Sequence, residues 1–142
     1  MFALQLVIGA FMIGLTVLIH AVALDRLKRV LDRLENFFRL RMRHSWKVPM
    51  LVIAVLGAFC SHIVQIWLWA FFYLSVDALN TIEEALYFST ATFTTVGYGD
   101  VVLSQEWRLV SSFQAANGFM LFGWSTAFIF EIMSQLYQAD SG

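Results

Sequence analysis

The segment most suited to chemistry is residues 94–100, which read TTVGYGD. Glycine tolerates positive φ angles, so Gly97 and Gly99 allow alternate peptide units of this segment to turn. In an ordinary strand the pleated backbone alternates, and the carbonyls cannot all face one way. The two glycines therefore let neighbouring peptide units of this segment present their carbonyl oxygens on one side together.

Histidines and serines in apolar surroundings are the other candidates. His20 and His62 lie within charge-free stretches, and His44 lies within a cationic segment. Ionisable groups in such stretches suggest a pH sensor, but we expect neutral histidines hydrogen-bonded between helices. The three are too scattered to propose a metal site. Ser89 or Ser125 could pair with His62 as nucleophile and base, yet no spacing favours this, and we expect no enzyme.

The composition is that of a membrane protein. Of 142 residues, 60% are hydrophobic and 13% are charged, whereas soluble domains average about 25% charged residues. Residues 1–24, 48–76 and 109–130 contain no Asp, Glu, Lys or Arg. Each stretch exceeds the roughly 18 apolar residues that a membrane-crossing helix needs. The sequence predicts an all-α membrane protein with three transmembrane helices.

The distribution of cationic residues predicts the orientation. Eight of the nine Lys and Arg residues lie within residues 25–47, and short cationic loops stay on the cytoplasmic side. We therefore expect a protein of the plasma membrane, with its N-terminus on the outer side and its C-terminus in the cytoplasm. The first apolar stretch has its cations on the C-terminal side, unlike a signal peptide, so we expect it to be retained.

The cationic segment, residues 25–47, has helical periodicity. Its apolar residues recur at three- and four-residue steps: Leu27, Val30, Leu31, Leu34, Phe37 and Phe38. One interpretation is a helix lying on the inner leaflet and binding anionic lipid headgroups. The interpretation we favour is a simple connector between the first two spans.

A shorter uncharged run, residues 85–99, lies between the second and third spans. Fifteen residues cannot cross the bilayer and return, so the run must dip in and come back. Backbone at that depth must line a cavity or be buried in protein. We expect a short helix over residues 81–93, capped by Asn80 or Thr81 with two glutamates in its first turn.

The TTVGYGD segment, placed after this short helix, resembles the selectivity filter of potassium channels. The sequence is similar to the potassium-channel pore-module family, as a small prokaryotic-type member with one extra N-terminal membrane helix (residues 1–24). The resemblance covers residues 48–138. Its parts are an outer helix at 49–74, a pore helix at 81–93, the filter at 94–100 and an inner helix at 105–137.

This resemblance implies a passive potassium-selective channel in a membrane such as the bacterial inner membrane. It implies potassium as the permeant ion, with no cofactor and no nucleic-acid partner. A weakly selective cation channel and a non-conducting regulatory subunit are the alternatives. Because the chain holds a single filter motif, closure around an axis requires a homotetramer.

The resemblance also assigns residues. The ion ligands are Thr95, Val96, Gly97 and Tyr98. Support for the filter comes from Thr94, Gly99, Asp100, Tyr87 and Phe88. Ala91 stands where some members of the family place a glutamate, so Asp100 has no carboxyl partner there.

The predicted inner helix begins with a Ser104 cap and Glu106 in the first turn. Gly118 and Gly123 match a hinge pattern of the family, and they equally permit close helix packing. Four residues share one face and either line the ion path or pack against the outer helix: Phe119, Phe122, Thr126 and Phe130. Glu131 lies near the inner mouth, where it either concentrates cations or is simply solvated.

Regularly spaced arginines, the voltage-sensing device of larger relatives, are absent from the two spans that precede the filter. No further domain follows Gly142 in this sequence. We therefore expect gating to depend on the membrane, the cationic segment, ions, pH or a partner.

Overall fold

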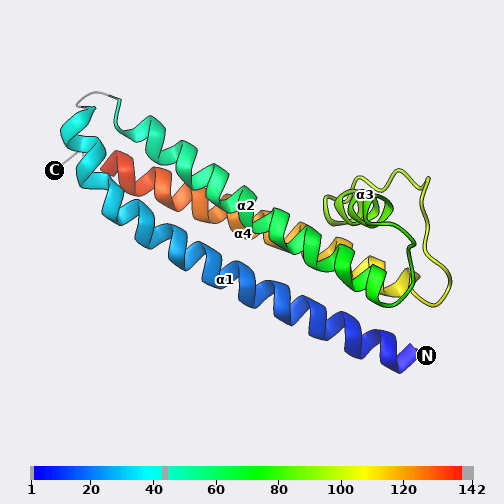
Figure 1. Cartoon of the computed structure of the whole chain (residues 1–142). Helices are drawn as coiled ribbons and strands as arrows, with labels where there is room; N and C mark the ends of the chain where they lie inside the picture. Colours follow the sequence, from blue (N-terminus) through cyan, green and yellow to red (C-terminus); the bar gives the residue numbers. More distant parts are fainter. Residues whose placement is uncertain (1, 43–44, 139–142) are drawn as a thin grey trace.

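Four helices make up the chain in the computed structural model, which describes residues 2–42 and 45–138. They are α1 (Phe2–Arg41), α2 (Lys47–Ser75), α3 (Ile82–Phe93) and α4 (Arg108–Gln138). The three long helices lie side by side, with α2 antiparallel to α1 and α4 (Figure 1). The short α3 and its flanking loops lie at one end of the bundle, beside α2 and α4. The all-helical prediction is confirmed.

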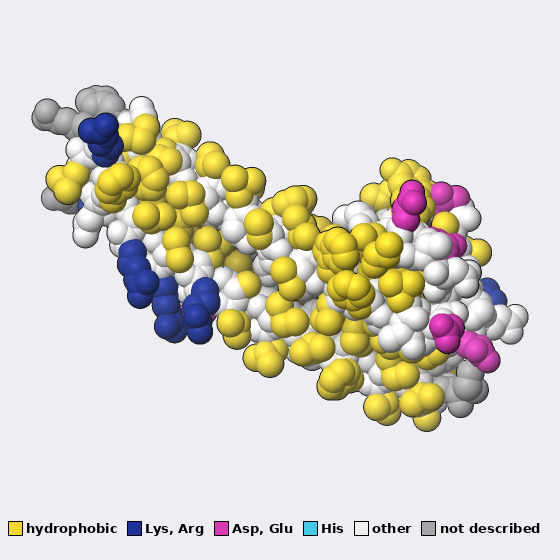
Figure 2. Space-filling view, in the orientation of Figure 1, with side chains coloured by type: hydrophobic (Ala, Val, Ile, Leu, Met, Phe, Trp, Pro, Cys, Tyr) yellow, Lys and Arg dark blue, Asp and Glu magenta, His cyan; other side chains and the backbone are white. Residues whose placement is uncertain are grey.

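The three long helices have the length and composition of membrane spans. They contain 40, 29 and 31 residues, and at about 1.5 Å per residue each exceeds the roughly 30 Å of hydrocarbon in a bilayer. On the face shown in Figure 2, hydrophobic side chains cover the middle of the bundle. Lys and Arg gather at one end, which we call the cationic end, and Asp and Glu gather at the other end, near α3. The chain is a multi-pass membrane protein.

The first span and the cationic segment form one continuous helix, so the predicted boundary between residues 24 and 25 is not a break in secondary structure. Residues 15–48 contain no Gly or Pro. Three ion pairs at i,i+4 spacing support the helix: Arg29 with Asp25, Lys28 with Asp32 and Arg39 with Glu35. The segment therefore does not form a separate helix lying flat on a lipid surface. Arg43 and His44 lie outside the described residues.

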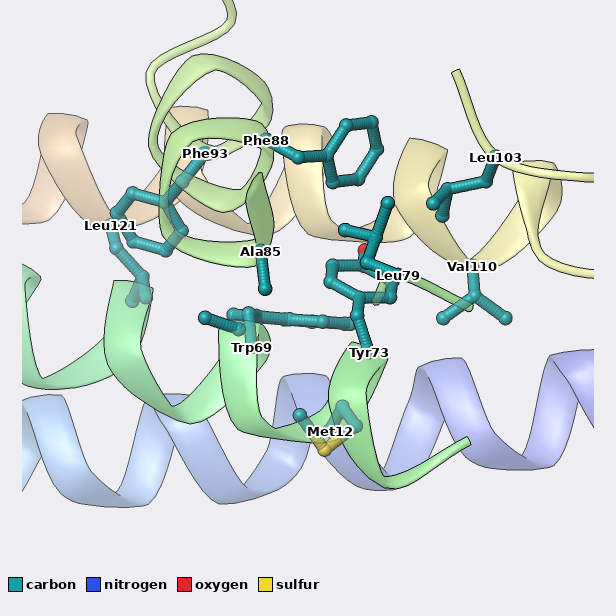
Figure 3. Packing of buried hydrophobic residues seen from close by; sticks show 11 residues of the cluster. Met12, Trp69, Tyr73, Leu79, Ala85, Phe88, Phe93, Leu103, Val110 and Leu121 are labelled. Atoms are coloured by element: carbon teal, nitrogen blue, oxygen red, sulfur yellow. The ribbon is translucent and has the colours of Figure 1, made fainter. Parts of the chain in front are cut away.

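Part of the apolar stripe of the cationic segment packs into the bundle, whereas Val30 and Phe37 of the stripe are exposed. Leu31 is buried, and it belongs to a cluster with Met50 of α2 and Ile132 of α4. A second, larger cluster surrounds α3 at the other end, where Trp69 and Tyr73 of α2 lie beneath the short helix (Figure 3). The two clusters position the two ends of the bundle.

The start of α3 follows the predicted cap. Thr81 Oγ1 accepts a hydrogen bond from Glu84 N at 3.2 Å. The Glu84 carboxylate in turn accepts one from Asn80 N at 3.3 Å. Of the two predicted caps, Thr81 is therefore the one used.

The start of α4 lies three residues later than predicted. Residues 105–107 form a turn, in which the Ser104 carbonyl accepts hydrogen bonds from Trp107 N and Arg108 N. Ser104 thus contributes its backbone to the turn, and Glu106 precedes the helix instead of lying in its first turn.

Candidate functional site

The loop after α3 has positive φ at every second residue. The angles are 63° at Thr95, 51° at Gly97 and 78° at Gly99. Both glycines therefore adopt the conformation predicted from the sequence. Thr95 was not predicted to do so, because left-handed backbone costs a residue with a side chain about 1–2 kcal/mol. This alternation is what turning successive peptide units to one side requires.

Hydrogen bonds tie the loop to the last turn of α3. Thr94 N and Thr94 Oγ1 donate to the Thr90 carbonyl at 3.0 and 2.7 Å. Gly97 N donates to the Ala91 carbonyl at 3.0 Å. These bonds satisfy carbonyls at the helix end, which carries the negative end of the helix dipole. The loop therefore begins in an electrostatic field that favours a cation.

Two tyrosines and an aspartate join α3 to the far end of the loop. The rings of Tyr87 and Tyr98 are stacked, with centroids 6.5 Å apart. Tyr87 Oη donates to Asp100 Oδ2 at 2.6 Å. This hydrogen bond lowers the pKa of Asp100 below its ordinary value and raises the pKa of Tyr87. Tyr87 thus gives Asp100 a partner although Ala91 has no carboxyl group.

The side chain of Phe88 lies away from the contact between Tyr87 and Asp100. It is 7% exposed and packs edge-on against Tyr73, with ring centroids 5.3 Å apart. In Figure 3 its ring lies beside α3, next to Leu79 and Tyr73 of the cluster. Phe88 thus packs α3 on the bundle, and it also lines, with Tyr87, the hollow beside Gly97 and Tyr98 of the loop.

In a single chain, the side of the loop that faces away from the helices is exposed. Residues 95–100 are all exposed, and Val96 and Tyr98 are 55% and 73% exposed. Apolar and aromatic side chains with this exposure indicate a surface that other groups cover. One chain provides one wall of any pore formed by this loop.

A buried glutamine, missed in the sequence, positions α3 between the long helices. Gln114 Nε2 donates to Ser89 Oγ and to the Ser89 carbonyl at 2.8 and 3.1 Å. Tyr73 Oη donates to Gln114 Oε1 at 2.7 Å. Ser89 Oγ donates to the Ile66 carbonyl at 2.7 Å. The signal in the sequence was an amide in an apolar span, a residue type that joins membrane helices.

Gly118 lies where α4 crosses the end of α3. A Cβ atom at Gly118 would lie 2.0 Å from the Phe93 carbonyl oxygen, whereas one at Gly123 would meet nothing within 4 Å. Helix α4 runs through both glycines without a break. Of the two interpretations, close packing explains Gly118.

The four residues predicted to share one face of α4 differ in their exposure. Phe119 and Phe130 are 72% and 65% exposed, and Thr126 is also exposed. Phe122 points inward and packs on His62, with ring centroids 4.4 Å apart. It lies at the edge of the predicted face, where the neighbouring helices reach it.

Glu131 is exposed near the cationic end. Its Oε1 accepts a hydrogen bond from Gln135 Nε2 at 2.6 Å, and Gln135 Oε1 accepts one from Lys28 Nζ at 2.9 Å. Glu131 is therefore linked through Gln135 to α1.

The histidines of the spans lie together, although 42 positions separate them in the sequence. His20 and His62 are buried with ring centroids 5.0 Å apart. Ser125 Oγ lies 2.9 Å from His62 Nε2 and 3.1 Å from His20 Nε2. The structure thus pairs Ser125 with His62, while Ser89 bonds elsewhere. The side chains of His20, His62 and Ser125 are all enclosed by the helices, as expected for histidines hydrogen-bonded between helices.

These elements define a pore module: two long membrane helices, α2 and α4, that flank a short helix and a loop of alternating backbone. In a comparison with known families, residues 50–135 match the family described as ion channel. The match covers more than half of the sequence, and the chain belongs to the ion channel family; it is not an enzyme. The chain matched no curated protein and no solved structure. Helix α1 lies outside the matched region.

Proposed function

We propose that this protein is a potassium-selective channel that conducts passively through a filter built from four copies of residues 94–100. The observation that carries the proposal is the alternation of positive φ at Thr95, Gly97 and Gly99. In this arrangement carbonyl oxygens replace the hydration shell of a potassium ion. The ligands are the carbonyls of residues 95–98, with the Thr95 hydroxyl as the innermost ring.

Supporting contacts hold the loop in this shape. The Tyr87 to Asp100 hydrogen bond fixes its outer end, and the bonds from Thr94 and Gly97 to α3 fix its inner end. Gln114 fixes α3 itself. A filter that selects between ions needs its oxygens held at the spacing of the favoured ion, and these contacts supply that restraint.

The uncovered loop supports a homotetramer. Exposed Val96 and Tyr98 would be covered by neighbouring copies, and cyclic symmetry would close the ring of carbonyls. The exposed stripe of α4, formed by Phe119, Thr126 and Phe130, would then line the path below the filter. In this assembly Gly123 is free to act as a hinge, and Glu131 lies near the inner mouth.

The charges of the two ends support the orientation. The cationic end would face the cytoplasm, with anionic lipid headgroups as its partners. Acidic residues gather around the loop at the other end, where they would concentrate cations. They are Asp77, Glu83, Glu84, Asp100 and Glu106. The protein would lie in a plasma membrane, such as a bacterial inner membrane.

Ion flux into liposomes tests the proposal. We expect purified protein to carry potassium and exclude sodium, and Gly97→Ala to lose this selectivity or the flux, because Gly97 has φ of 51°. Gly14→Ala is the matched control, since a Cβ atom there meets nothing within 4 Å. Equal sodium and potassium flux would indicate a weakly selective channel. No flux under several pH and lipid conditions would indicate a non-conducting subunit.

A further inference from the structure

Five polar side chains meet inside the bundle, midway along the three long helices. We call them the histidine cluster: His20 of α1, Ser61, His62 and Gln65 of α2, and Ser125 of α4. Each is at most 5% exposed. None of them belongs to the filter or its supports, and no feature of ion conduction described above requires them.

The hydrogen bonds of the histidine cluster have a defined direction. Gln65 Nε2 can only donate, and it lies 3.0 Å from His20 Nδ1, which must therefore accept. A neutral imidazole has one N–H, so His20 donates from Nε2 to Ser125 Oγ. Ser125 is then able to donate its own hydrogen to His62 Nε2. This chain of bonds joins α2, α1 and α4 with two neutral histidines, while His62 Nδ1 and Gln65 Oε1 are buried without a hydrogen-bond partner.

An added proton disrupts this arrangement. A proton on His20 Nδ1 would face the Gln65 N–H at 3.0 Å, which leaves the uncharged Ser61 Oγ, also 3.0 Å away, as its acceptor. A proton on His62 Nε2 would remove the acceptor of Ser125. Rotating the Gln65 amide relieves the first conflict but supplies no negative charge.

No counter-charge is at hand for a charged imidazole. Residues 1–24, 48–76 and 109–130 contain no Asp, Glu, Lys or Arg. Among the described residues, the groups that face the two histidines are each other, the polar members of the cluster, and the rings of Phe93, Phe122 and Trp124. A buried charge without a partner is strongly unfavourable. Proton binding must therefore favour a conformation in which water reaches the cluster.

The polar contacts between α1 and α4 differ on the two sides of the histidine cluster. On the filter side of the cluster, Asn117 of α4 donates to Thr16 of α1 at 2.7 Å, and both side chains are buried. On the other side, the polar contact between these helices is the exposed bond from Lys28 to Gln135. Surface contacts of this kind contribute little. Ser125 is thus the buried polar connection between α1 and the second half of α4, which also pack through the apolar cluster of Leu31, Ile132 and Leu136.

We propose that the histidine cluster is a proton-sensitive latch: protonation of His20 or His62 separates α1 from the half of α4 that follows Ser125. Because α4 carries the exposed stripe, this separation would change the width of the ion path. That last consequence rests on the proposed channel function, whereas the separation itself does not.

Spin-label distances test the separation directly. In a Cys60→Ser background, labels are placed at Val30→Cys on α1 and Met133→Cys on α4, both exposed positions. Labelled chains are diluted with unlabelled ones so that distances within one chain dominate. We expect the distance to increase between about pH 8 and about pH 4, a range that brackets the ordinary titration of histidine.

Histidine variants decide whether the cluster is responsible. We expect the distance change to be lost in His20→Gln/His62→Gln and kept in His44→Gln, the matched control at the third histidine. The single variant His62→Gln, which keeps the His20 to Ser125 bond, is the second test if the double variant does not assemble, and it should show a reduced change. A constant distance in the parent protein, or a change that persists in the double variant, would overturn the latch.

Flux measured on the same samples separates this inference from the channel proposal. A distance change with potassium flux that follows pH supports both. A distance change without flux at any pH supports the latch and contradicts the channel proposal. Flux that is independent of pH while the distance is constant contradicts the latch alone.

Discussion

Replacing Gly118 with alanine should displace the filter, because α4 and the end of α3 touch through backbone at this point. The new methyl carbon would lie 2.0 Å from the Phe93 carbonyl oxygen and 2.8 Å from its carbon. Ordinary contact begins at about 3.4 Å, so the two elements must separate by roughly 1.4 Å. Backbone cannot rotate away as a side chain does. Overpacking of this kind costs about 1–3 kcal/mol, which exceeds the gain of about 0.5–1 kcal/mol from alanine in a helix.

Gly123→Ala is the matched control for this prediction. It gains the same helix propensity and meets nothing within 4 Å, so it should be as stable as the parent protein or slightly more so. We expect Gly118→Ala to lower the unfolding midpoint in detergent and to reduce potassium flux in liposomes. If Gly118→Ala matches the parent in stability, the packing argument is wrong. If Gly123→Ala loses flux while keeping its stability, a hinge at Gly123 is supported.

Three further predictions concern α3 and its loop. Tyr87→Phe removes the hydrogen-bond donor that lowers the pKa of Asp100. In the parent protein the bond from Tyr87 to ionised Asp100 should stabilise the filter above the pKa of Asp100, and this stabilisation should be lost only as pH falls through that lowered pKa. In the variant, acid inactivation of flux should begin at a higher pH, closer to the ordinary aspartate value, and an unshifted pH profile would contradict this. Thr81→Ala removes the cap of α3 and should lower stability by about 1 kcal/mol, measured by chemical unfolding. Thr90→Ala, outside the cap, should not lower stability, because alanine favours a helix more than threonine does. Gln114→Leu should cost about 1–2 kcal/mol, because it leaves the buried Tyr73 hydroxyl without its acceptor and removes both bonds to Ser89. Selectivity should fall with it; unchanged selectivity would show that the amide does not position α3.

The sequence predicted the spans, the short helix and the shape of the loop because each depends on local information. Charge-free stretches of sufficient length identify α1, α2 and α4, and Thr81 with the two following glutamates identifies the start of α3. Glycines at alternate positions predict positive φ at Gly97 and Gly99. The start of α4 was placed too early because a polar turn, residues 105–107, reads like the first turn of a helix.

The remaining features depend on contacts between distant residues. Nothing local to Thr95 predicts its positive φ, which the hydrogen bonds at the end of α3 impose. The meeting of His20 with His62, and of Gln114 with Ser89, follows from how the helices pack. Sequence reasoning could say that each polar residue within a span needs a partner, but not which partner. The same limit explains why the sequence left two environments open for Phe122, the ion path and the packing against α2.

The dependence of the matched ion-channel region on α1 has a practical consequence. Residues 50–135 alone would leave the Asn117 amide without Thr16 and would leave Gln65 and Ser125 without His20. These groups would then face lipid, where unpaired polar groups are costly. A shortened chain made from the family region should therefore be a poor substitute for the whole one. Chimeras that import this pore into another protein need to carry the first helix with it.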